Sequence, residues 1–403
     1  MTSERAYVWT WLPGATEPVV AGYAEEDGGI TRFAYGRSYL DREDAIALGP
    51  ELPVIRGVQD PGSGLRIAGV LRDGSPDGWG RGVIRHSLGI AEGDDITEVH
   101  YMLRSGSNRF GALDFQSSPD EYVPRTDTAS LEELLTASEI LEAGGTLTPA
   151  LEAALEHGTS IGGARPKATL IAADGKQYLA KFPSSTDRLF SYVNTEATML
   201  ALADVVGIRV PDWRIETVAG KDVLLVERFD RTPDGGRRHV LSGLTLARED
   251  EMSARYVSYP QLLDVLREHG DKEAGRELFE RIAFNIAISN SDDHARNHAA
   301  FWDGENLRLT PAYDLAPGPR SGDTATQAMA YGRDGQRQSS FPLLAEHAGA
   351  YGLTAALGQE ILERVESGIR EHWSEAADRA RLTARDREYL WGRQVLNPAF
   401  RYA

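Results

Sequence analysis

Two oxygen-bearing side chains five positions apart point to phosphoryl-transfer chemistry. Asp292 and Asn297 lie in the stretch Asn-Ser-Asp-Asp-His-Ala-Arg-Asn-His, residues 290–298. Phosphoryl transfer needs a carboxylate that accepts the proton of the attacking hydroxyl, and an oxygen ligand that holds Mg²⁺ beside it. An Asp and an Asn at this separation meet both needs. A polar surface loop would contain the same residues, so the pair needs support from elsewhere in the chain.

A second carboxylate, Asp314, stands inside the apolar run Leu-Thr-Pro-Ala-Tyr-Asp-Leu, residues 309–315. A charge among apolar residues is costly unless it is paired or bound to a metal. Asp303 and Gly304 predict a hairpin that would return Asp314 to the neighbourhood of Asn297. Asp314 would then be a metal ligand. The structural alternative is a turn carboxylate that caps a backbone amide.

A glycine-containing loop and a lysine in an apolar strand are candidates for binding phosphate. The loop, residues 160–167, reads Ser-Ile-Gly-Gly-Ala-Arg-Pro-Lys. Its glycines would let backbone N–H groups approach phosphates, but it is not a Walker A loop, and taken alone an ordinary turn fits it better. Lys181 lies in the apolar strand 178–182, where a buried ammonium needs a partner such as phosphate or Glu196. Lys181 would otherwise reach out to water.

The segment Val-Glu-Arg-Phe-Asp-Arg, residues 226–231, ends a strand whose apolar run predicts burial on both faces. Backbone at such a strand end could meet the edge of an adenine. A charged strand terminus is the structural alternative.

Metal chemistry without phosphate is a weaker alternative. The chain has no cysteine, which excludes disulfides and thiolate metal sites. His294 and His298 stand four apart beside Asp292 and Asp293, so a metal-only site remains open.

Local patterns predict the elements that would position these residues. Gly28-Gly29 predicts a hairpin turn, and residues 173–176 predict another between strands 168–172 and 177–182. Residues 116–129 are interpreted as a linker. Apolar side chains at Leu278, Ile282 and Ile286 predict a helix face. Further predicted elements are helices over 41–48, 81–88, 149–157, 195–206, 277–290, 359–380 and 384–395, a helix from Ser130 with a capping box, and a strand over 221–227.

Composition is typical of a soluble globular protein of two or three domains, with 403 residues, 41% apolar and 26% charged. The net charge of −18 repels phosphate backbones, so direct nucleic-acid binding is not expected. No apolar run is long enough for a membrane span, and the start of the chain does not resemble a signal peptide. A cytoplasmic location, with no membrane partner, is therefore expected.

The order of these motifs resembles the HipA family of bacterial toxin kinases. The motifs that carry the resemblance span most of the chain: 75–79, 160–167, 179–183, 226–231, 291–297 and 311–315. The resemblance implies an α+β fold, with a two-lobed core like that of protein kinases. It implies an N-terminal α+β domain over 1–125, a nucleotide-binding region like a kinase N-lobe over 126–245, and a helical C-lobe over 246–403.

The resemblance also implies roles for individual residues. Asp292 would be the catalytic base, and Asn297 and Asp314 would hold Mg²⁺. ATP would contact these two metal ligands and Gly162, Gly163, Ala164, Arg165, Pro166, Lys167, Lys181, Glu227, Arg228, Phe229, His294 and Tyr313. Ser160 matches the serine that the family autophosphorylates, where about two added negative charges would repel ATP.

Two departures from the family pattern bear on these roles. Asp293 replaces a small residue sometimes found after the catalytic Asp, and its charge would alter metal binding. Arg165-Pro166 stiffens the phosphate loop, which would hinder its ejection from the pocket.

The family implies partners that these residues do not specify. They are a small helix-turn-helix antitoxin of the HipB type, DNA bound only through that antitoxin, and a protein target, for which aminoacyl-tRNA synthetases are precedents. Two other functions fit the sequence: a kinase fold acting on a lipid or small-molecule hydroxyl, and a non-catalytic co-repressor subunit.

Overall fold

The computed structural model describes residues 5–62, 64–76, 78–90, 94–126, 129–148, 150–152, 155, 165–172, 175–318, 322 and 324–402. These residues form two compact units, each assembled from separate stretches of chain. Unit one comprises the described residues within 1–185, 216–241 and 301–305, and unit two those within 186–215, 242–300 and 306–403. The three domains expected from the sequence, with limits near residues 125 and 245, stay a prediction.

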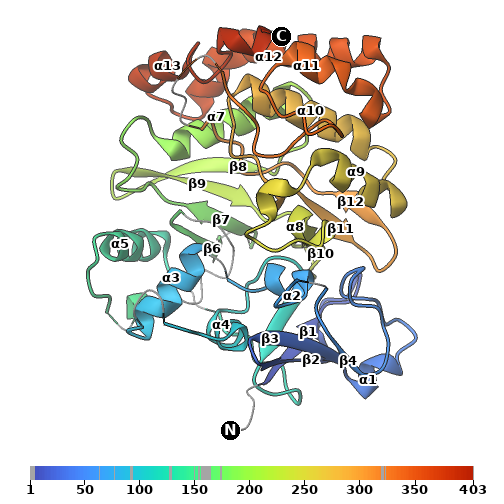
Figure 1. Ribbon diagram of the computed structural model, residues 1–403. Coiled ribbons are helices and arrows are strands. Elements are labelled where there is room, and N and C mark those ends of the chain that lie inside the picture. Colours follow the sequence, from blue (N-terminus) through green and yellow to red (C-terminus); the bar gives the residue numbers. More distant parts are fainter. Residues whose placement is uncertain are drawn as a thin grey trace. The chain divides into compact units, whose positions relative to one another are not determined.

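An antiparallel sheet of five strands lies in unit one, in the order β4-β3-β2-β1-β5 (Figure 1). Its strands are β1 (Arg5–Thr10), β2 (Val19–Asp27), β3 (Ile30–Tyr35), β4 (Val58–Gln59) and β5 (Leu113–Gln116). Gly28 and Gly29 have φ values of 60° and 77°, the positive pair that a two-residue hairpin turn requires. The predicted hairpin is therefore confirmed. Four helices belong to this part of the chain: α1 (Arg37–Leu40), α2 (Gly69–Asp73), α3 (Gly78–Ser87) and α4 (Glu98–Arg104).

The helix predicted over 41–48 is wrong. Tyrosine hydroxyls bind backbone groups of this segment, among them the Leu48 N–H, which would have donated to the Asp44 carbonyl in such a helix. Tyr39 Oη donates to the Ile46 carbonyl oxygen at 2.8 Å, and the Leu48 N–H donates to Tyr35 Oη at 3.0 Å. These bonds hold the segment in an irregular path after α1.

A four-stranded sheet, in the order β6-β7-β9-β8, forms the second layer of strands. It contains β6 (Lys167–Ile171), β7 (Gln177–Lys181), β9 (Lys221–Glu227) and β8 (Trp213–Val218). Helix α5 (Leu131–Glu142) begins at Ser130 with the predicted capping box and packs on this sheet. Leu134 and Leu135 of α5 share one buried cluster with Ala180 of β7 and Leu225 of β9. Helix α5 thus packs against the strands that carry Lys181 and Glu227.

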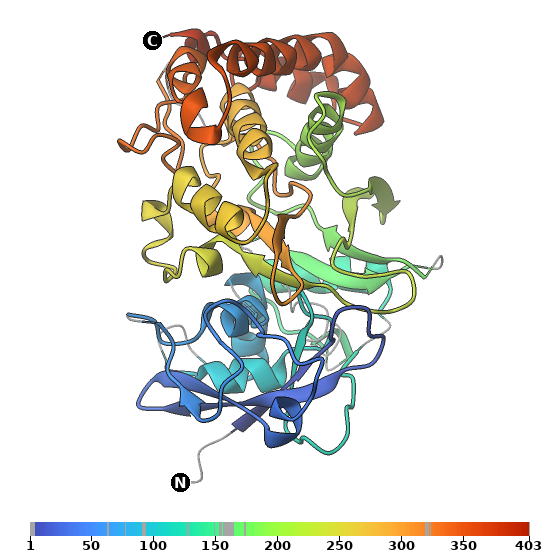
Figure 2. The same ribbon diagram turned by 90° about the vertical axis from the view of Figure 1, so that its right-hand side faces the viewer.

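Unit two is mainly helical, as Figure 2 shows, with α7 in green and the later helices in yellow to red. Its helices are α7 (Tyr192–Val205), α8 (Gly243–Leu246), α9 (Tyr259–Glu268), α10 (Ala274–Ala287), α11 (Phe341–Glu346), α12 (Ala355–Arg379) and α13 (Ala384–Leu390), with the 3₁₀ turns η1 (Ala254–Tyr256), η2 (Ala295–Asn297), η3 (Ala348–Tyr351) and η4 (Pro398–Arg401). Hydroxyl side chains cap several of them. Ser191 accepts the Asn194 N–H, which starts α7 three residues before the predicted position.

Helix α10 positions the candidate catalytic segment. Its apolar face is the predicted one, and Leu278, Ile282 and Ile286 are at most 1% exposed.

A third sheet follows, in the order β10-β11-β12, with β10 (His239–Ser242), β11 (Ala299–Trp302) and β12 (Leu307–Leu309). Together, the antiparallel sheets and the helical unit confirm the α+β class.

His239 is a buried titratable group in unit one. Its Nε2 atom lies 3.0 Å from the Trp11 carbonyl oxygen and 3.1 Å from Thr10 Oγ1. The carbonyl can only accept, so the proton of the neutral ring is on Nε2. Burial lowers the pKa of His239 from 6.5 to about 4. The folded protein therefore holds this ring neutral at pH values where the unfolded chain protonates it.

We expect His239 to make stability fall as the pH is lowered between its unfolded and folded pKa values. The unfolded chain binds the extra proton in this window, which costs about 2 kcal/mol between pH 7 and pH 5. Urea unfolding of the wild type and of His239→Gln measures this loss. The variant should lose clearly less stability over the same interval, while His372→Gln, at an exposed position of α12, should behave as the wild type. Equal losses in all three proteins would refute the assignment.

Candidate active site

The candidate catalytic segment leaves α10 through a residue in the left-handed region. Ser289 has a φ of 55°. Its hydroxyl donates to the Gln394 carbonyl oxygen at 2.6 Å, and its own carbonyl accepts the Gly318 N–H at 2.9 Å. A Cβ on Gly318 would lie 2.6 Å from Ser291 Oγ, so glycine permits this close approach. The start of the segment is therefore fixed on two sides.

Asp292 and Asn297 come together within this segment. The Asn297 side-chain nitrogen Nδ2 lies 3.4 Å from the Asp292 carbonyl oxygen, and the Asn297 backbone N–H donates to His294 at 2.8 Å. Asn297 is 8% exposed, whereas Asp292 is exposed. This orientation presents the amide oxygen of Asn297 as the atom suited to a metal. The Asp292 carboxylate can be reached from solvent.

The hairpin predicted between the two motifs is present. Gly304 has a φ of 102°, and β12 leads back along the third sheet. The Thr310 N–H donates to the Ala299 carbonyl oxygen at 3.0 Å, and Tyr313 Oη donates to the Arg296 carbonyl oxygen at 2.8 Å. The residue before Asp314 is thus bonded to the residue before Asn297.

Asp314 has a left-handed backbone conformation, with a φ of 58°. Such a conformation is uncommon outside glycine and costs on the order of 1 kcal/mol or more, although Asp tolerates it better than most residues. Its neighbours Ala312 and Leu315 are 2% and 3% exposed, while Asp314 itself is exposed. Buried flanks hold the strained residue with its carboxylate toward solvent. This is an arrangement that clusters at functional sites.

Asp293 is turned into the interior, unlike its neighbour Asp292. Its carboxylate accepts from Asn285 Nδ2 at 2.7 Å, from His298 Nε2 at 2.9 Å and from the Tyr259 hydroxyl. Burial acts to raise the pKa of Asp293, but the His298 ring and these hydrogen bonds outweigh it and lower the pKa. The sequence predicts that this charge alters metal binding; in the structure the carboxylate accepts from three donors in the protein interior.

The metal-only alternative has little support in the part of the chain that is described. No group of three or more His, Asp or Glu side chains there is placed to hold a metal ion. The Nε2 atom of His298 is already bonded to Asp293. Mg²⁺ needs less, because it is commonly held by one or two protein oxygens together with substrate phosphates and water. Asn297 and Asp314 fit that requirement.

Two lysines stand directly opposite each other in unit one. Lys167 of β6 and Lys181 of β7 are paired in the antiparallel register, so their side chains share one face of the sheet. Lys167 is 7% exposed and Lys181 is half-buried. Like charges in this arrangement repel, and an anion between them would be stabilised. Glu196, the other candidate partner of Lys181, is buried in α7, and that pairing stays a prediction.

The phosphate loop can be placed only in part. Ser160, Gly162, Gly163 and Ala164 lie outside the described residues. Beyond them, the Phe182 N–H donates to the Pro166 carbonyl oxygen at 3.1 Å, which extends the β6–β7 ladder up to the loop.

Part of the segment expected to contact adenine is bonded to, or packed against, other groups of the protein. Arg228 is 6% exposed, its guanidinium binds Asp230, and its backbone N–H donates to the Gln177 carbonyl oxygen at 2.8 Å. Phe229 lies between Phe110 and Phe301, with ring centroids 5.9 and 5.8 Å away. The donor groups of Arg228 thus point to protein atoms.

The sequence did not predict that three side chains donate hydrogen bonds to Asp293. These are Tyr259, Asn285 and His298. Asn285 had a usable signal, because it is a polar residue on the buried side of α10. Tyr259 comes from another helix, and nothing in its local sequence points to Asp293.

Comparison with known proteins identifies relatives for this arrangement. The chain is 24% identical over 337 residues to the protein Y4mE of Sinorhizobium fredii, covering 74% of each. It is 22% identical to the serine/threonine-protein kinase toxin HipA of Shewanella oneidensis, covering 68% of this chain and 67% of the relative. A solved complex of HipA, HipB and operator DNA from the same species contains a chain of the same fold, with a TM-score of 0.69, 19% identity, and coverage of 97% of this chain and 96% of the other.

The relatives named as kinases class the chain as a kinase. The model described as the HipA-like C-terminal domain matches residues 159–373, just over half of the chain, and the model of the HipA N-terminal domain matches residues 15–116. The chain therefore belongs to the HipA family, which is associated with toxin–antitoxin systems. The resemblance seen in the sequence motifs is confirmed.

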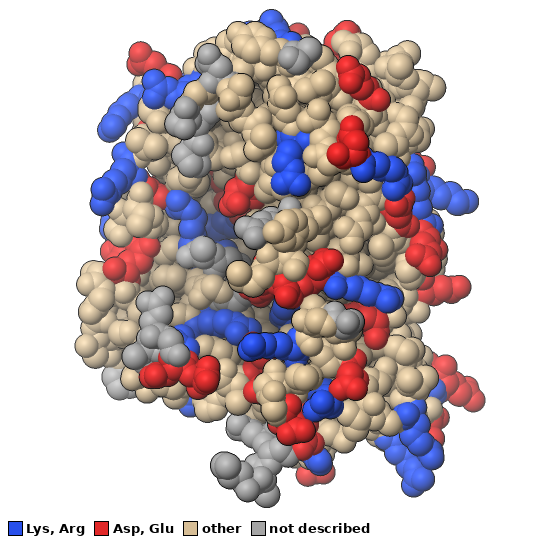
Figure 3. Space-filling view, in the orientation of Figure 1, with Lys and Arg blue, Asp and Glu red and all other residues tan. Residues whose placement is uncertain are grey.

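Surface charge and hydropathy add one observation each. Acidic and basic side chains are interspersed over the face shown in Figure 3. Among the residues that the structure describes, no helix is both long enough and apolar enough to cross a bilayer.

We expect Asp293→Asn to lower kcat at least about tenfold, because it removes the charge that fixes the residues beside Asp292 and Asn297. The variant should also lose roughly 1–3 kcal/mol of stability, because three buried donors lose a charged acceptor. Steady-state kinetics and urea unfolding measure the two effects separately. Asp264→Asn is the control, because Asp264 is an Asp of the same unit in an exposed ion pair with Arg333. A folded Asp293→Asn protein with wild-type kcat would rule out this positioning role.

Proposed function

We propose that this kinase uses ATP and Mg²⁺ to phosphorylate serine or threonine hydroxyls of a protein, with Asp292 as the catalytic base. The observation that carries the proposal is the grouping of three side chains in one unit. Asn297 is bonded to the Asp292 backbone, and Tyr313 brings the chain at Asp314 back to the same segment. A base beside two metal ligands is the arrangement that phosphoryl transfer needs.

Asp292 suits the role of base because its carboxylate is exposed and its backbone is held. An incoming hydroxyl can reach it and give up its proton to a carboxylate oxygen. Asp293 does not suit that role, because its carboxylate is already saturated with donors.

Asn297 Oδ1 and the Asp314 carboxylate would bind the Mg²⁺ ion. Bound Mg²⁺ would neutralise charge on the phosphates during transfer. The left-handed conformation of Asp314 supports this assignment, because strain of this kind persists where a side chain must be aimed. His294 and Tyr313 lie next to these ligands in the chain and are proposed to border the nucleotide.

Phosphate binding falls to residues of unit one. The Lys167–Lys181 pair provides two positive charges on one face of the sheet. Residues 162–167 would add backbone N–H donors, and the backbone of Glu227–Phe229 would meet the adenine. Ser160 is the proposed autophosphorylation site.

The proposed partner is a HipB-like antitoxin. The solved relative is a complex of HipA with HipB and operator DNA. A net charge of −18 opposes direct contact with DNA, so DNA would be bound through the antitoxin. The proposed target is a cytoplasmic protein, for which aminoacyl-tRNA synthetases are the precedent.

Asp292→Ala should lower phosphate transfer roughly 10²–10⁴-fold, because a positioned base is lost. The measurement is incorporation of radiolabel from ATP with Mg²⁺, read on the kinase itself and on lysate separated into protein and lipid fractions. Intact-mass spectrometry with site mapping locates the phosphate, and Ser160→Ala tests the proposed site. Asp204→Asn, an exposed carboxylate at the end of α7, serves as control. Equal transfer by Asp292→Ala and wild type would refute the base, and label found only in lipid would refute the protein substrate.

Asp314→Asn should raise the Mg²⁺ concentration needed for half-maximal activity and lower kcat. Asn is chosen because it tolerates a positive φ, so the variant removes the charge while keeping the backbone. Activity titrated against Mg²⁺ at saturating ATP measures the effect, and thermal unfolding should be close to wild type. An unchanged Mg²⁺ requirement would show that Asp314 is not a metal ligand.

A further inference from the structure

Two arginines that follow the end of β9 bind the same loop. This loop leads into β5 of the five-stranded sheet. Arg228 donates to the carbonyl oxygens of Asn108 at 3.3 Å and Arg109 at 2.6 Å, and to Asn108 Oδ1 at 3.1 Å. Arg231 donates to Asn108 Oδ1 at 3.0 Å, to the Arg109 carbonyl at 2.5 Å and to the Gly111 carbonyl at 3.0 Å. Both guanidinium groups thus hold one short segment, residues 108–111.

Asp230 links the two arginines to each other and to the loop. It accepts from Arg228 Nε and Nη2, both at 2.7 Å, from Arg231 Nη1 at 3.0 Å and from the Gly111 N–H at 2.7 Å. Burial acts to raise the pKa of Asp230, but the two arginine charges and these bonds lower it well below its usual range. We call Arg228, Asp230, Arg231 and residues 108–111 the arginine clamp.

The clamp is shielded from water, so its bonds are not weakened as surface ion pairs are. The side chains of Arg228 and Arg231 are 3% and 5% exposed, and Asp230 is 1% exposed. Removing one partner of such a network leaves a buried charge without its counterpart. The segment that carries these residues therefore has little freedom to move relative to the loop.

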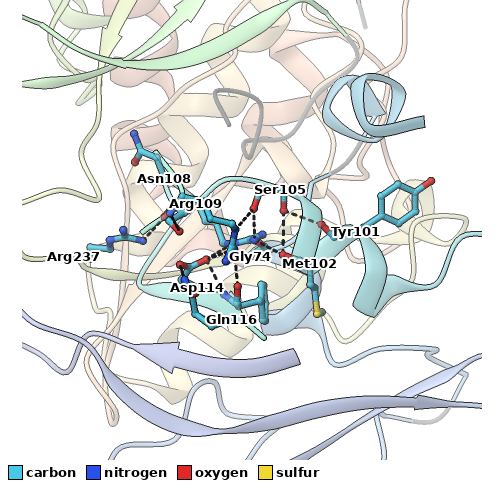
Figure 4. Close-up of polar contacts among 12 residues, drawn as sticks. Gly74, Tyr101, Met102, Ser105, Asn108, Arg109, Asp114, Gln116 and Arg237 are labelled. Atoms are coloured by element: carbon cyan, nitrogen blue, oxygen red, sulfur yellow. Dashed lines mark hydrogen bonds and ion pairs between the residues drawn. The ribbon is translucent and has the colours of Figure 1, made fainter. Parts of the chain in front are cut away.

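The loop is itself anchored to the N-terminal sheet and its helices. Figure 4 shows the Arg109 guanidinium at the centre of this anchor, bonded to Asp114 at 2.8 Å and to the carbonyl oxygens of Gly74 at 2.9 Å and Ser105 at 3.1 Å. Asp114 belongs to β5, and Arg109 and Asp114 are both fully buried. A continuous set of buried hydrogen bonds therefore runs from β5 through the loop to the end of β9.

We propose that the arginine clamp is a positioning device for the nucleotide base: the N-terminal domain, through Asn108, sets the backbone of Glu227–Phe229 that receives the adenine. This inference rests on the proposed binding of ATP. The Arg228 N–H is bonded to Gln177, and Arg231 Nε donates to Gln177 Oε1 at 3.2 Å, so the clamp fixes the strand end from two directions. Phe229, held between Phe110 and Phe301, is placed by the same contacts. The motif 226–231 thereby acts on the base through backbone position, while the side chains of Arg228, Asp230 and Arg231 face the protein.

The test separates the base from the phosphates. Asn108→Ala removes the Oδ1 atom that both arginines share, while Asp230 still satisfies each guanidinium. We expect ATP to bind about tenfold more weakly with Mg²⁺, the loss typical of one charge-assisted hydrogen bond, and the preference for ATP over GTP to fall by a similar factor. Tripolyphosphate with Mg²⁺, which lacks the base, should bind as it does to wild type. Isothermal titration calorimetry with the full chain measures all three ligands.

Two further variants complete the test. Asn108→Asp keeps an acceptor at Oδ1 and should restore the preference for ATP. Arg32→Lys is the matched control, because Arg32 belongs to the same sheet but binds Asp60 and Asp27, which lie outside the clamp and its anchor, at 2.6 and 3.4 Å. It should lose some stability but keep the ratio of ATP to GTP affinity.

The outcomes distinguish the two proposals. If wild type binds ATP and Asn108→Ala binds it equally tightly with the same preference, the clamp inference fails and the proposed function stands. If the variant loses ATP and tripolyphosphate affinity together, the clamp is only structural and the inference also fails. A wild-type protein that binds no ATP overturns the proposed function and the clamp inference with it.

Discussion

The buried carboxylate of Asp293 is the interaction on which the order of unit two's site depends. It takes hydrogen bonds from α9, from α10 and from the residue that follows η2. A carboxylate so deeply buried is tolerable only when its donors are all in place. The segment between Asp292 and Asn297 therefore has one favourable conformation, because any other would leave this charge without partners. The geometry of the proposed base and metal ligand follows from that constraint.

Unit one also contains a buried carboxylate held by its donors, but there the groups around the carboxylate carry an excess of positive charge. Asp230 is shared by two arginines, and the paired lysines Lys167 and Lys181 stand on strands of the sheet that also contains β9. A chain with a net charge of −18 thus places two lysines opposite each other on one sheet. Local charge decides the binding of a small anion, whereas net charge decides encounters with a polyanion. An acidic protein can therefore bind ATP and still disfavour nucleic acid.

Much of the local structure was predictable because its causes are local. Strand 221–227 has the predicted limits, and the hairpin at Asp303-Gly304 follows from its turn residues. The helix predicted over 41–48 failed because tyrosine hydroxyls captured its backbone groups, and no helical period reveals that.

The roles of charged residues were less predictable, because their partners are distant in sequence. Tyr259 is 34 positions from Asp293, and Asn108 is 120 positions from Arg228. A local pattern cannot tell whether a charged side chain faces solvent or a partner contributed by another element. For this reason the sequence did not show that the side chains of Asp293 and Arg228 are bonded to buried protein partners.

The contrast between Asp292 and Asp293 explains how two adjacent acids can serve one site. Two exposed carboxylates on adjacent residues would repel each other and raise each other's pKa. Burying Asp293 with a histidine removes its charge from the solvent-facing side, so Asp292 remains the single exposed acid of its segment. In the proposed site, Asp314 would supply a second carboxylate from another segment, where its backbone is strained. That strain is sustained because the Ala312 N–H is bonded to the Arg209 carbonyl at 2.7 Å and Leu315 is buried, which fixes both sides of the residue.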